Sequence, residues 1–563
     1  MLRPLAILLL AAAAAASPAH ADPVELMPGV TFDRTIEFTP NGAVVLNVIT
    51  APRPGTANGL YQLTPVLSGG TLTGAAEPLT RIEQDVASQA TTAGVNGDFT
   101  TGDGRPAGIV LTGGTLAAQP AAGRSSIGID AAGTLHVDRV KLFGTWQGTG
   151  QRRTLNELGR PPAPGQYALF TPAYGPAAPT VAGSAEVVLD SFPAAAPNTD
   201  LQAVVAQAGS GGGEAIPPGG AVLMAGGAAA AKLRAEAPVG AALTVRLGLQ
   251  PAWTGMVAAS GCGPALVRTG KPVFRSLEDL TSEQVTGRDP RAAVAQLADG
   301  RILLVAVDGG RPGYSVGLTS YELAKALVGL GAITACGLQP GDPVTAAFDG
   351  QLLSTPDAGE RPVREGLLVE YAGVYVPPLP LPLLNGDPGR TVEPLSYRLV
   401  RPSTVTARLV APDGSVLSLV AGIQQPPGTY TLPQPTLAVE GGWRFDVTAI
   451  DDLGRSSEAT RTFRYDTTLA GLSVPAVDRG RVPVSFTLAR PAAVRLVIET
   501  AAGVIVRDLG TSSLPGGRQT VVWDGRLPHG SPAYAGRYLA HVYATTAAGT
   551  SDLTTPFAFR RGG

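Results

Sequence analysis

Short runs in which apolar and polar residues alternate recur along the chain, and they predict many β-strands and few helices. Two runs depart from this alternation because consecutive apolar residues make up most of their length. They are RILLVAVDGG (301–310) and AITACGL (332–338). Continuous apolar runs of this length between turn residues are typical of buried strands. The first of them ends in an acid, Asp308, so the pattern predicts a carboxylate at the end of a buried strand.

The segment between these strands, TSYELAKALVGLG (319–331), has the period of an amphipathic helix. Its apolar stripe is formed by leucines at 323, 327 and 330. Thr319 and Glu322 have the spacing of a capping box, which predicts where the helix begins. Glu322 therefore has a structural explanation, and we do not count it among the candidate catalytic acids.

On a larger scale, the pattern divides the chain into segments. Residues 22–373 alternate β-rich runs with glycine turns, and 374–390 is a proline-rich linker. Two all-β Ig-like sandwiches are expected beyond it, at 391–466 and 467–563, because both contain a strand, an Arg-Pro corner, a second strand and a glycine turn. The predicted fold class is α+β, with a mixed-sheet first domain that has few helices.

Composition supports this division. The chain has 563 residues, too many for one core, and its 72 glycines and 50 prolines suit short strands joined by turns. The net charge of −2 gives no electrostatic reason to expect nucleic acid or an anionic membrane as a partner.

The N-terminal residues 1–21 are expected to be a cleaved signal peptide, since a basic start and an apolar core precede Ala19-His20-Ala21. The mature protein is then secreted or located in the cell envelope, with no membrane span after removal of the signal. An oxidising compartment allows the two cysteines, Cys262 and Cys336, to form a disulfide, but their spacing alone leaves the pairing open.

Histidine is scarce, and this restricts the chemistry. One of the four histidines leaves with the signal and two lie in the tail, so the first domain offers His136 and two cysteines, too few for a classical zinc site. His136 lies in the alternating run TLHVDRV and is expected to face outward from a strand. No cofactor is predicted. Oxygen ligands would accept a cation such as Ca²⁺, but no EF-hand-like spacing supports one.

Carboxylates, amides and arginine are the remaining candidates. Asn96, Asp98 and Asp103 lie among glycines in GVNGDFTTGDGRPAG, a pattern that suits close approach of a ligand but also an ordinary turn. The guanidinium of Arg291 is always charged and can form paired hydrogen bonds with phosphate or carboxylate. The alternative is that Arg291 forms an ion pair at the surface. Asp308 stands at a strand end, where functional residues are common.

Several motifs together resemble the phosphodiester glycosidase family, in the order that is typical of it. They span most of residues 25–373 and are VNGDF (95–99), IPPGGAVLMAGG (216–227), GCGPALVRTGK (261–271), DPRAAVA (289–295), the segment 307–332 and GERPVREGLL (359–368). Separately, WDGRLPHGSPAYAGRY (523–538) is similar to the Ig-like module of flagellar hook-capping proteins.

The resemblance implies hydrolysis of a sugar-1-phosphodiester at the anomeric carbon–oxygen bond, with a sugar phosphodiester or a cell-envelope glycan as the partner. A phosphate ester is already a good leaving group, so little help from a general acid is needed. The catalytic residues implied are Asp98, Arg291 and Asp308. The substrate-binding residues implied are Asn96, Ser315, Asp342, Glu360 and Arg361.

One loop departs from the family pattern. Members usually have Leu-Asp-Gly-Gly-Gly-Ser where this chain has Leu338-Gln339-Pro340-Gly341-Asp342-Pro343. Gln339 carries no charge, and each proline removes a backbone donor that a phosphate cradle would use. The sequence therefore leaves two functions open: a phosphodiester glycosidase, or a catalytically inactive protein that binds glycans in the same cleft.

Overall fold

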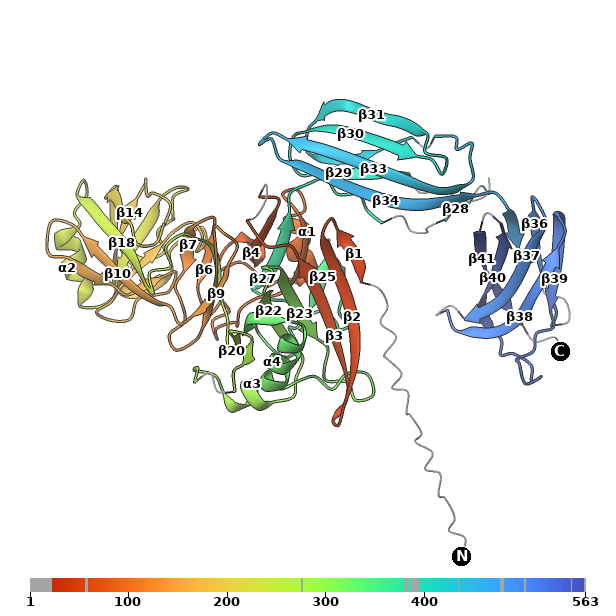
Figure 1. Ribbon diagram of the computed structural model, residues 1–563. Helices are drawn as coiled ribbons and strands as arrows, with labels where there is room; N and C mark the ends of the chain where they lie inside the picture. The colour runs from red at the N-terminus through yellow and green to blue at the C-terminus, as the bar shows by residue number, and fades with distance from the viewer. Residues whose placement is uncertain are drawn as a thin grey trace, which may run out of the picture. The chain divides into compact units, whose positions relative to one another are not determined.

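The computed structural model describes residues 23–55, 59–274, 277–378, 383–385, 394–433, 435–475, 480–500, 503–547 and 549–560 (Figure 1). The predicted signal peptide at 1–21 lies outside the described residues, as do 379–382 and 386–390 of the predicted linker. No helix in the part of the chain that is described is long and apolar enough to cross a membrane.

The described residues are mostly β, so the α+β label overstated the share of helix. The helices are short because few segments combine helical periodicity with capping signals. They are η1 (Ser68–Gly70), α1 (Leu79–Asp85), α2 (Ala229–Glu236), α3 (Ser282–Thr286) and α4 (Ser320–Gly329).

The chain divides into two compact units. The first contains the described residues up to Pro54, together with Leu63–Glu83 and Ala93–Val369. The second contains Gly55–Gln62, Gln84–Thr92 and the described residues from Glu370 onward.

An eight-stranded sheet forms one part of the first unit. Its order is β1 (Val24–Met27), β2 (Val30–Thr39), β3 (Gly42–Ala51), β23 (Ile302–Val307), β22 (Arg291–Leu297), β24 (Ala332–Gly337), β20 (Ala265–Arg268) and β21 (Lys271–Pro272). The two predicted apolar strands are β23 and β24, and every residue of β23 is buried. Both are thus confirmed.

Helix α4 packs on this sheet (Figure 1). Thr319 accepts a hydrogen bond from the backbone of Glu322, whose side chain accepts from Thr319 in return, so the predicted capping box is confirmed. Leu323 and Leu327 are buried against the sheet strands, whereas Leu330 lies at the C-cap and is exposed. The helix therefore fixes the segment between β23 and β24.

Two further sheets lie beside the first. One has the order β26 (Gln351–Leu352), β25 (Ala346–Phe348), β5 (Thr91–Asn96), β27 (Glu365–Tyr371), β4 (Tyr61–Leu67). The other has the order β7 (Thr115–Ala118), β6 (Val110–Thr112), β19 (Met256–Gly261), β8 (Ser126–Asp130), β9 (Leu135–Asp138).

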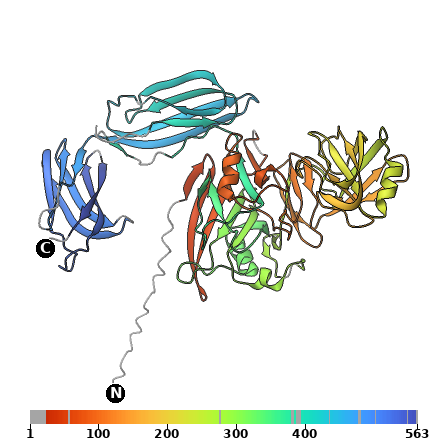
Figure 2. The same cartoon turned by 180° about the vertical axis from the view of Figure 1, so that it is seen from behind.

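The α2 lobe, residues 140–250, contains two more sheets and appears in orange and yellow in both views (Figures 1 and 2). Its hydrophobic core is continuous with residues of β6, β7 and β19. One sheet is β11 (Arg153–Leu155), β10 (Lys141–Gln147), β18 (Ala242–Gln250), β15 (Asp200–Val204). The other is β12 (Glu157–Leu158), β13 (Tyr167–Phe170), β17 (Ala221–Ala225), β14 (Thr180–Leu189), β16 (Gln207–Gly212). Alternate residues of β18 are buried, as expected for strands with one apolar face.

The second unit contains two β-sheet sandwiches, each with a separate core. The first is formed by β28 (Leu383–Asn385), β34 (Ser456–Asp466), β33 (Gly441–Asp451), β30 (Ser403–Val410), β31 (Val416–Gln425), with β29 (Ser396–Leu399) and β32 (Gly428–Thr431). The second is formed by β35 (Leu469–Ser473), β36 (Val482–Leu488), β39 (Gly517–Trp523), with β38 (Ile505–Leu514), β37 (Ala492–Thr500), β40 (Gly536–Thr546), β41 (Gly549–Phe559). Arg401-Pro402 and Arg490-Pro491 lie between consecutive strands in both, as the repeat pattern predicted.

Candidate functional site

Strand topology brings Asp308 and the loop Leu338–Thr345 to one edge of the eight-stranded sheet. Strands β23 and β24 both pair antiparallel with β22, so they run in the same direction and end at the same edge. Asp308 directly follows β23, and the loop directly follows β24. The α4 crossover between the strands thus delivers two distant segments to one place.

A pocket lies at this edge, which we call the Asp308 pocket. It spans about 310 Å³ when the open solvent above it is counted, and only about 20 Å³ of it is space that a water-sized group can occupy. Its charged lining residues are Asp308, Asp342, Asp357 and Arg361, and the others are Pro290, Gly309, Gly341, Val344, Pro356, Ala358 and Gly359. Three of the predicted site residues therefore meet in one concave feature, although they are far apart in the sequence.

The Asp308 carboxylate is held rigidly at the base of this arrangement. Only 3% of Asp308 is exposed. One carboxylate oxygen accepts a hydrogen bond from the Tyr314 hydroxyl at 2.9 Å, and the other accepts from the Thr355 backbone N–H at 3.1 Å. The Arg311 guanidinium lies 4.1 Å from the centre of the Tyr314 ring and fixes that ring in turn.

The other charged groups of the pocket are mobile by comparison, because Asp342, Asp357 and Arg361 are exposed. Arg311 lies 3.8 Å from the Asp357 carboxylate, which balances part of the negative charge. The pocket therefore combines one fixed carboxylate with an arginine and two acids that can adjust to a ligand.

Arg291 was expected to face Asp308 and Asn96, and its contacts correct that expectation. Its guanidinium donates to three backbone carbonyls, those of Leu318 at 2.8 Å, Gln284 and Gly287. Asp289 lies 3.7 Å away, and burial lowers the pKa of Arg291. The side chain ties α3 to the β23–α4 connection, each of its three nitrogens donates to a carbonyl, and it is not part of the pocket lining.

Asn96 is fully buried and supports the loop instead of a ligand. Its amide nitrogen donates to the Gln339 carbonyl at 2.9 Å, and its side-chain oxygen accepts from the Thr345 N–H at 3.3 Å. The backbone N–H groups of Gln339 and Gly341 donate to the carbonyls of Gly97 and Pro290. These loop donors are therefore turned into the protein, away from any phosphate in the pocket.

Asp98 belongs to a buried charge network behind the loop, which we call the inner acid network. Its carboxylate accepts from the Gly108 N–H at 2.6 Å and from the Arg124 guanidinium, which stacks on the Phe99 ring at 4.1 Å. A Cβ at Gly261 would lie 2.1 Å from the Asp98 carboxylate. Gly261 and Gly108 therefore leave space that the Asp98 carboxylate fills.

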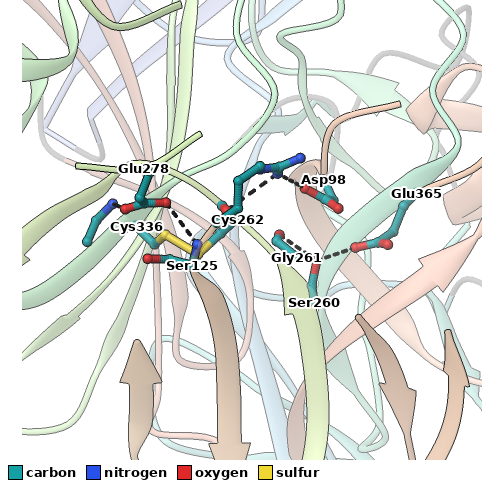
Figure 3. The surroundings of a disulfide bond; sticks show 10 residues. Asp98, Ser125, Ser260, Gly261, Cys262, Glu278, Cys336 and Glu365 are labelled. Atoms are coloured by element: carbon teal, nitrogen blue, oxygen red, sulfur yellow. Dashed lines mark hydrogen bonds and ion pairs between the residues drawn. A yellow bond between two sulfur atoms is a disulfide. The ribbon is translucent and has the colours of Figure 1, made fainter. Parts of the chain in front are cut away.

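Glu365 completes the inner acid network. Its side chain accepts a hydrogen bond from the Ser260 hydroxyl (Figure 3). Burial raises the pKa of Glu365 to about 8, and the negative charge of Asp98 adds to the rise. Glu365 is therefore mostly protonated at neutral pH, which lets two carboxyl groups share this site with one guanidinium.

The two cysteines form a disulfide, with their Cα atoms 6.1 Å apart, so the pairing that the sequence left open is settled. Cys336 lies in β24, just before the loop, and Cys262 follows β19. Glu278 accepts hydrogen bonds from the N–H groups of Ser125 and Ala265 beside this bond (Figure 3). The disulfide therefore joins the strand before the loop to the end of β19, the strand whose Ser260 contacts Glu365.

Two other predicted binding residues have structural partners. The Ser315 hydroxyl donates to the Asp308 carbonyl and accepts from the Val45 N–H at 3.0 Å. The Glu360 carboxylate caps the start of α1 by accepting from the N–H and the hydroxyl of Thr80, at 2.9 and 2.7 Å. Both side chains shape the loops around the pocket, and neither lines it.

The remaining candidates from the sequence also have local partners. His136, on β9, lies 2.9 Å from an Asp130 carboxylate oxygen, as suits a partly exposed strand residue. The exposed Asp103 accepts hydrogen bonds from Thr101 and Arg105. Among the described residues, no three His, Cys, Asp or Glu side chains gather as ligands for a metal ion.

Sequence reasoning missed Arg124, Asp357 and Glu365. Glu365 stands inside the GERPVREGLL motif, and Asp357 lies just before it, so the motif was the available signal for both. Arg124 had no signal, because its pairing with Asp98 depends on how β5 and β8 lie in space.

Two segments of the chain match known families. Residues 195–370 match the phosphodiester glycosidase family, and residues 471–548 match the FlgD Ig-like domain. All the lining residues of the Asp308 pocket fall inside the first match.

Individual relatives cover parts of the chain. The SPbeta prophage-derived uncharacterized protein YomE of Bacillus subtilis is 31% identical over 107 residues, 19% of this chain and 16% of YomE. A Synechocystis protein of known structure is 25% identical with a TM-score of 0.51, and 61% of this chain aligns with 62% of it. This chain thus spans less than two thirds of the length of either relative.

The chain is also similar to the catalytic domain of zebrafish N-acetylglucosamine-1-phosphodiester α-N-acetylglucosaminidase. The identity is 12% and the TM-score is 0.34, over 62% of this chain and 85% of that one. The resemblance to phosphodiester glycosidases and to FlgD Ig-like domains, predicted from the motifs, is therefore confirmed for residues 195–370 and 471–548.

Proposed function

We propose that the protein is an exported hydrolase of sugar-1-phosphodiesters that acts in the Asp308 pocket. The observation that carries this proposal is the meeting of a fixed carboxylate, Asp308, with an exposed guanidinium, Arg361, in one concave site. The match of residues 195–370 to the phosphodiester glycosidase family supports the choice of reaction.

The reaction adds water across the bond between the anomeric carbon and the ester oxygen. The water oxygen bonds to the anomeric carbon, and the carbon–oxygen bond breaks with its electron pair going to the phosphate. A phosphomonoester leaves, and the proton that the water loses is released to solvent. Because the departing phosphate is a weak base, the site needs no strong general acid, which agrees with the scarcity of histidine.

Asp308 is the residue we assign to the sugar side of the reaction. Hydrogen bonds from Tyr314 and Thr355 fix its carboxylate, so it is placed in advance to stabilise positive charge at the anomeric carbon or to orient the attacking water. Asp342, exposed on the loop, is the second carboxylate that we assign to the sugar hydroxyls or the water.

Arg361 is the residue we assign to the phosphate, in place of Arg291. An arginine with exposed donors forms paired, charge-assisted hydrogen bonds with phosphate oxygens. Arg291 cannot do this without breaking its bonds to three backbone carbonyls. The inner acid network then has a supporting role, which is to hold the loop that carries Asp342.

Export is part of the proposal. The disulfide between Cys262 and Cys336 suits an oxidising compartment, as does the predicted signal peptide. Sugar phosphodiesters outside the cytoplasm include the polymers of cell envelopes, so we propose a cell-envelope glycan as the natural substrate.

A second function, glycan binding without turnover, is favoured by one observation. The backbone N–H groups of Gln339 and Gly341 donate to carbonyls within the protein. These two groups therefore do not bind a phosphate in the pocket. Such a protein would keep the Asp308 pocket for recognition and use the sandwiches as spacers.

The test is the release of free sugar by the full-length mature protein from UDP-N-acetylglucosamine and from a panel of sugar-1-phosphodiesters. A hydrolase releases sugar, and Asp308→Asn and Arg361→Ala each slow the release, while the exposed control Asp190→Asn retains the full rate. Glycan binding with no release from any substrate would reject the hydrolase and favour the second function.

A further inference from the structure

A second pocket lies in the α2 lobe, and its lining is cationic. It encloses about 910 Å³, open solvent included. We call it the cationic pocket, and its lining residues are Arg152, Arg153, Thr154, Asn156, Gly165, Tyr167, Ala228, Ala229 and Lys232. No acid is among these residues, whereas the Asp308 pocket has three.

The start of α2 forms one wall of the cationic pocket. Lys232 lies three residues after Ala229 and four after the N-cap residue Ala228, so its side chain stands over the start of the helix. No side chain caps the helix at Ala228, and the alanine side chains are too short to cover its N-terminus. The positive end of the helix dipole thus faces the same space as the basic side chains.

The Tyr167 hydroxyl is a polar group without a partner among the described residues. Tyr167 lines the pocket, only 6% of it is exposed, and its ring packs 5.1 Å from the ring of Trp146. Arg153 and Glu236 both act electrostatically on this hydroxyl, which places it beside the cationic wall. A buried hydroxyl without a hydrogen-bond partner is costly. Binding of a ligand that accepts a hydrogen bond from it would therefore be favoured.

The charges of the pocket are not all neutralised within the protein. The Nε and Nη2 groups of Arg153 donate hydrogen bonds to the Glu236 carboxylate. The Nη1 group of Arg153 is left for another acceptor. Arg152 and Lys232 are exposed. An anion with several oxygens suits this set of donors, and a phosphate group provides such oxygens.

We propose that the cationic pocket binds a phosphate group of an anionic ligand. Arg152, Lys232 and Nη1 of Arg153 pair with the phosphate oxygens, the start of α2 adds its dipole, and the Tyr167 hydroxyl donates a hydrogen bond. This proposal stands apart from the reaction in the Asp308 pocket, because the two pockets share no lining residue.

Calorimetric titration of the full-length mature protein tests the proposal, with inorganic phosphate and dimethyl phosphate as probes. We expect saturable binding that weakens as ionic strength rises. Arg152→Ala combined with Lys232→Ala is expected to weaken it by about 10-fold or more. Tighter binding of dimethyl phosphate would identify the phosphodiesters of a polymer as the source of the ligand, and tighter binding of inorganic phosphate would identify phosphate ions or monoesters.

Two further variants separate recognition from general charge and from stability. Lys141→Ala removes a cation from an exposed position of the same lobe outside the pocket, and it is expected to leave binding unchanged. Tyr167→Phe keeps the ring and is expected to weaken phosphate binding without lowering the melting temperature. Absence of saturable binding, or equal weakening by Lys141→Ala and by the double variant, would overturn the proposal.

Discussion

Asp308 and Arg361 occupy the same pocket, but the fold treats them differently. Asp308 is buried and held by two hydrogen bonds, whereas Arg361 is exposed. Groups fixed before the substrate arrives contribute most to stabilising charge in a transition state. The fixed carboxylate should therefore matter more for turnover, and the exposed arginine more for holding the phosphate.

This difference gives a prediction for kinetics. Asp308→Asn is expected to lower kcat by about 100-fold or more, because the amide cannot stabilise positive charge at the anomeric carbon. Arg361→Ala is expected to lower kcat/KM by about 10- to 100-fold with a larger share in KM. Steady-state assays of sugar release measure both. Equal effects on kcat and KM from the two variants would contradict these roles.

Glu365 gives a prediction for pH dependence. Its folded-state pKa is about 8, above that of the same group in the unfolded chain. The stability contributed by its neutral form is therefore complete at acidic pH, and it is lost as the pH rises through about 8. Glu365→Gln keeps a neutral group of similar shape. Between acidic and alkaline pH, the first unit should therefore lose less stability in this variant than in the wild type.

Thermal unfolding across this pH range measures the effect, with the exposed Glu37→Gln as the control. The melting curves of wild type and Glu365→Gln should diverge at alkaline pH and approach each other at acidic pH. Parallel pH profiles for the two proteins would show that Glu365 is not neutral in the folded state.

How far single residues could be predicted depended on the range of their contacts. Asp308 at the end of an apolar strand followed from the local pattern alone. The burial of Arg291 did not, because its three carbonyl partners come from residues 284, 287 and 318, and only the folded chain brings them together. Likewise, nothing in the sequence near Asp98 marks Arg124 as its partner.

Among the elements, the disulfide has the clearest consequence for stability. It joins residues 74 positions apart, and the loop-entropy model gives about 4 kcal/mol for a loop of that length. Cys262→Ala combined with Cys336→Ala should lower the free energy of unfolding of the first unit by roughly this amount. Denaturant unfolding measures it, and a loss under about 1 kcal/mol would contradict the expectation.

The loop Leu338–Thr345 is the element in which the chain departs from the motif usual in phosphodiester glycosidases, the family that residues 195–370 match. If Gln339 and Pro340 limit turnover, Gln339→Asp combined with Pro340→Gly should raise kcat/KM by about 10-fold, because an acid and a backbone donor return to the loop. The main-chain carbonyl of residue 339 stays bonded to Asn96 in this variant, so the loop should keep its place. Unchanged kcat/KM would mean that the loop does not limit the reaction.

Elements with complete local signals were predicted well. Helix α4 had a capping box and flanking strands, both present in the structure, and two of the three leucines of its predicted apolar stripe are buried. The order of the strands had no local signal. In particular, β3 pairs with β23 across some 250 intervening residues, a pairing set by long-range packing.

At the scale of the molecule, every lining residue of both pockets lies in the first unit. The second sandwich has its own core and contributes none of them. Removal of residues 467–563 should therefore leave kcat/KM for small sugar phosphodiesters within about 2-fold of the full-length value. A larger loss would assign the FlgD-type domain a part in the reaction itself.

The central claim is that water attacks the anomeric carbon and leaves the phosphorus untouched. Hydrolysis of a sugar-1-phosphodiester in ¹⁸O-labelled water, with mass spectrometry of the released phosphomonoester, tests it most directly. We expect sugar release that depends on Asp308 and a phosphomonoester without label. Labelled phosphomonoester would show cleavage at phosphorus and contradict the account, as would a complete lack of turnover.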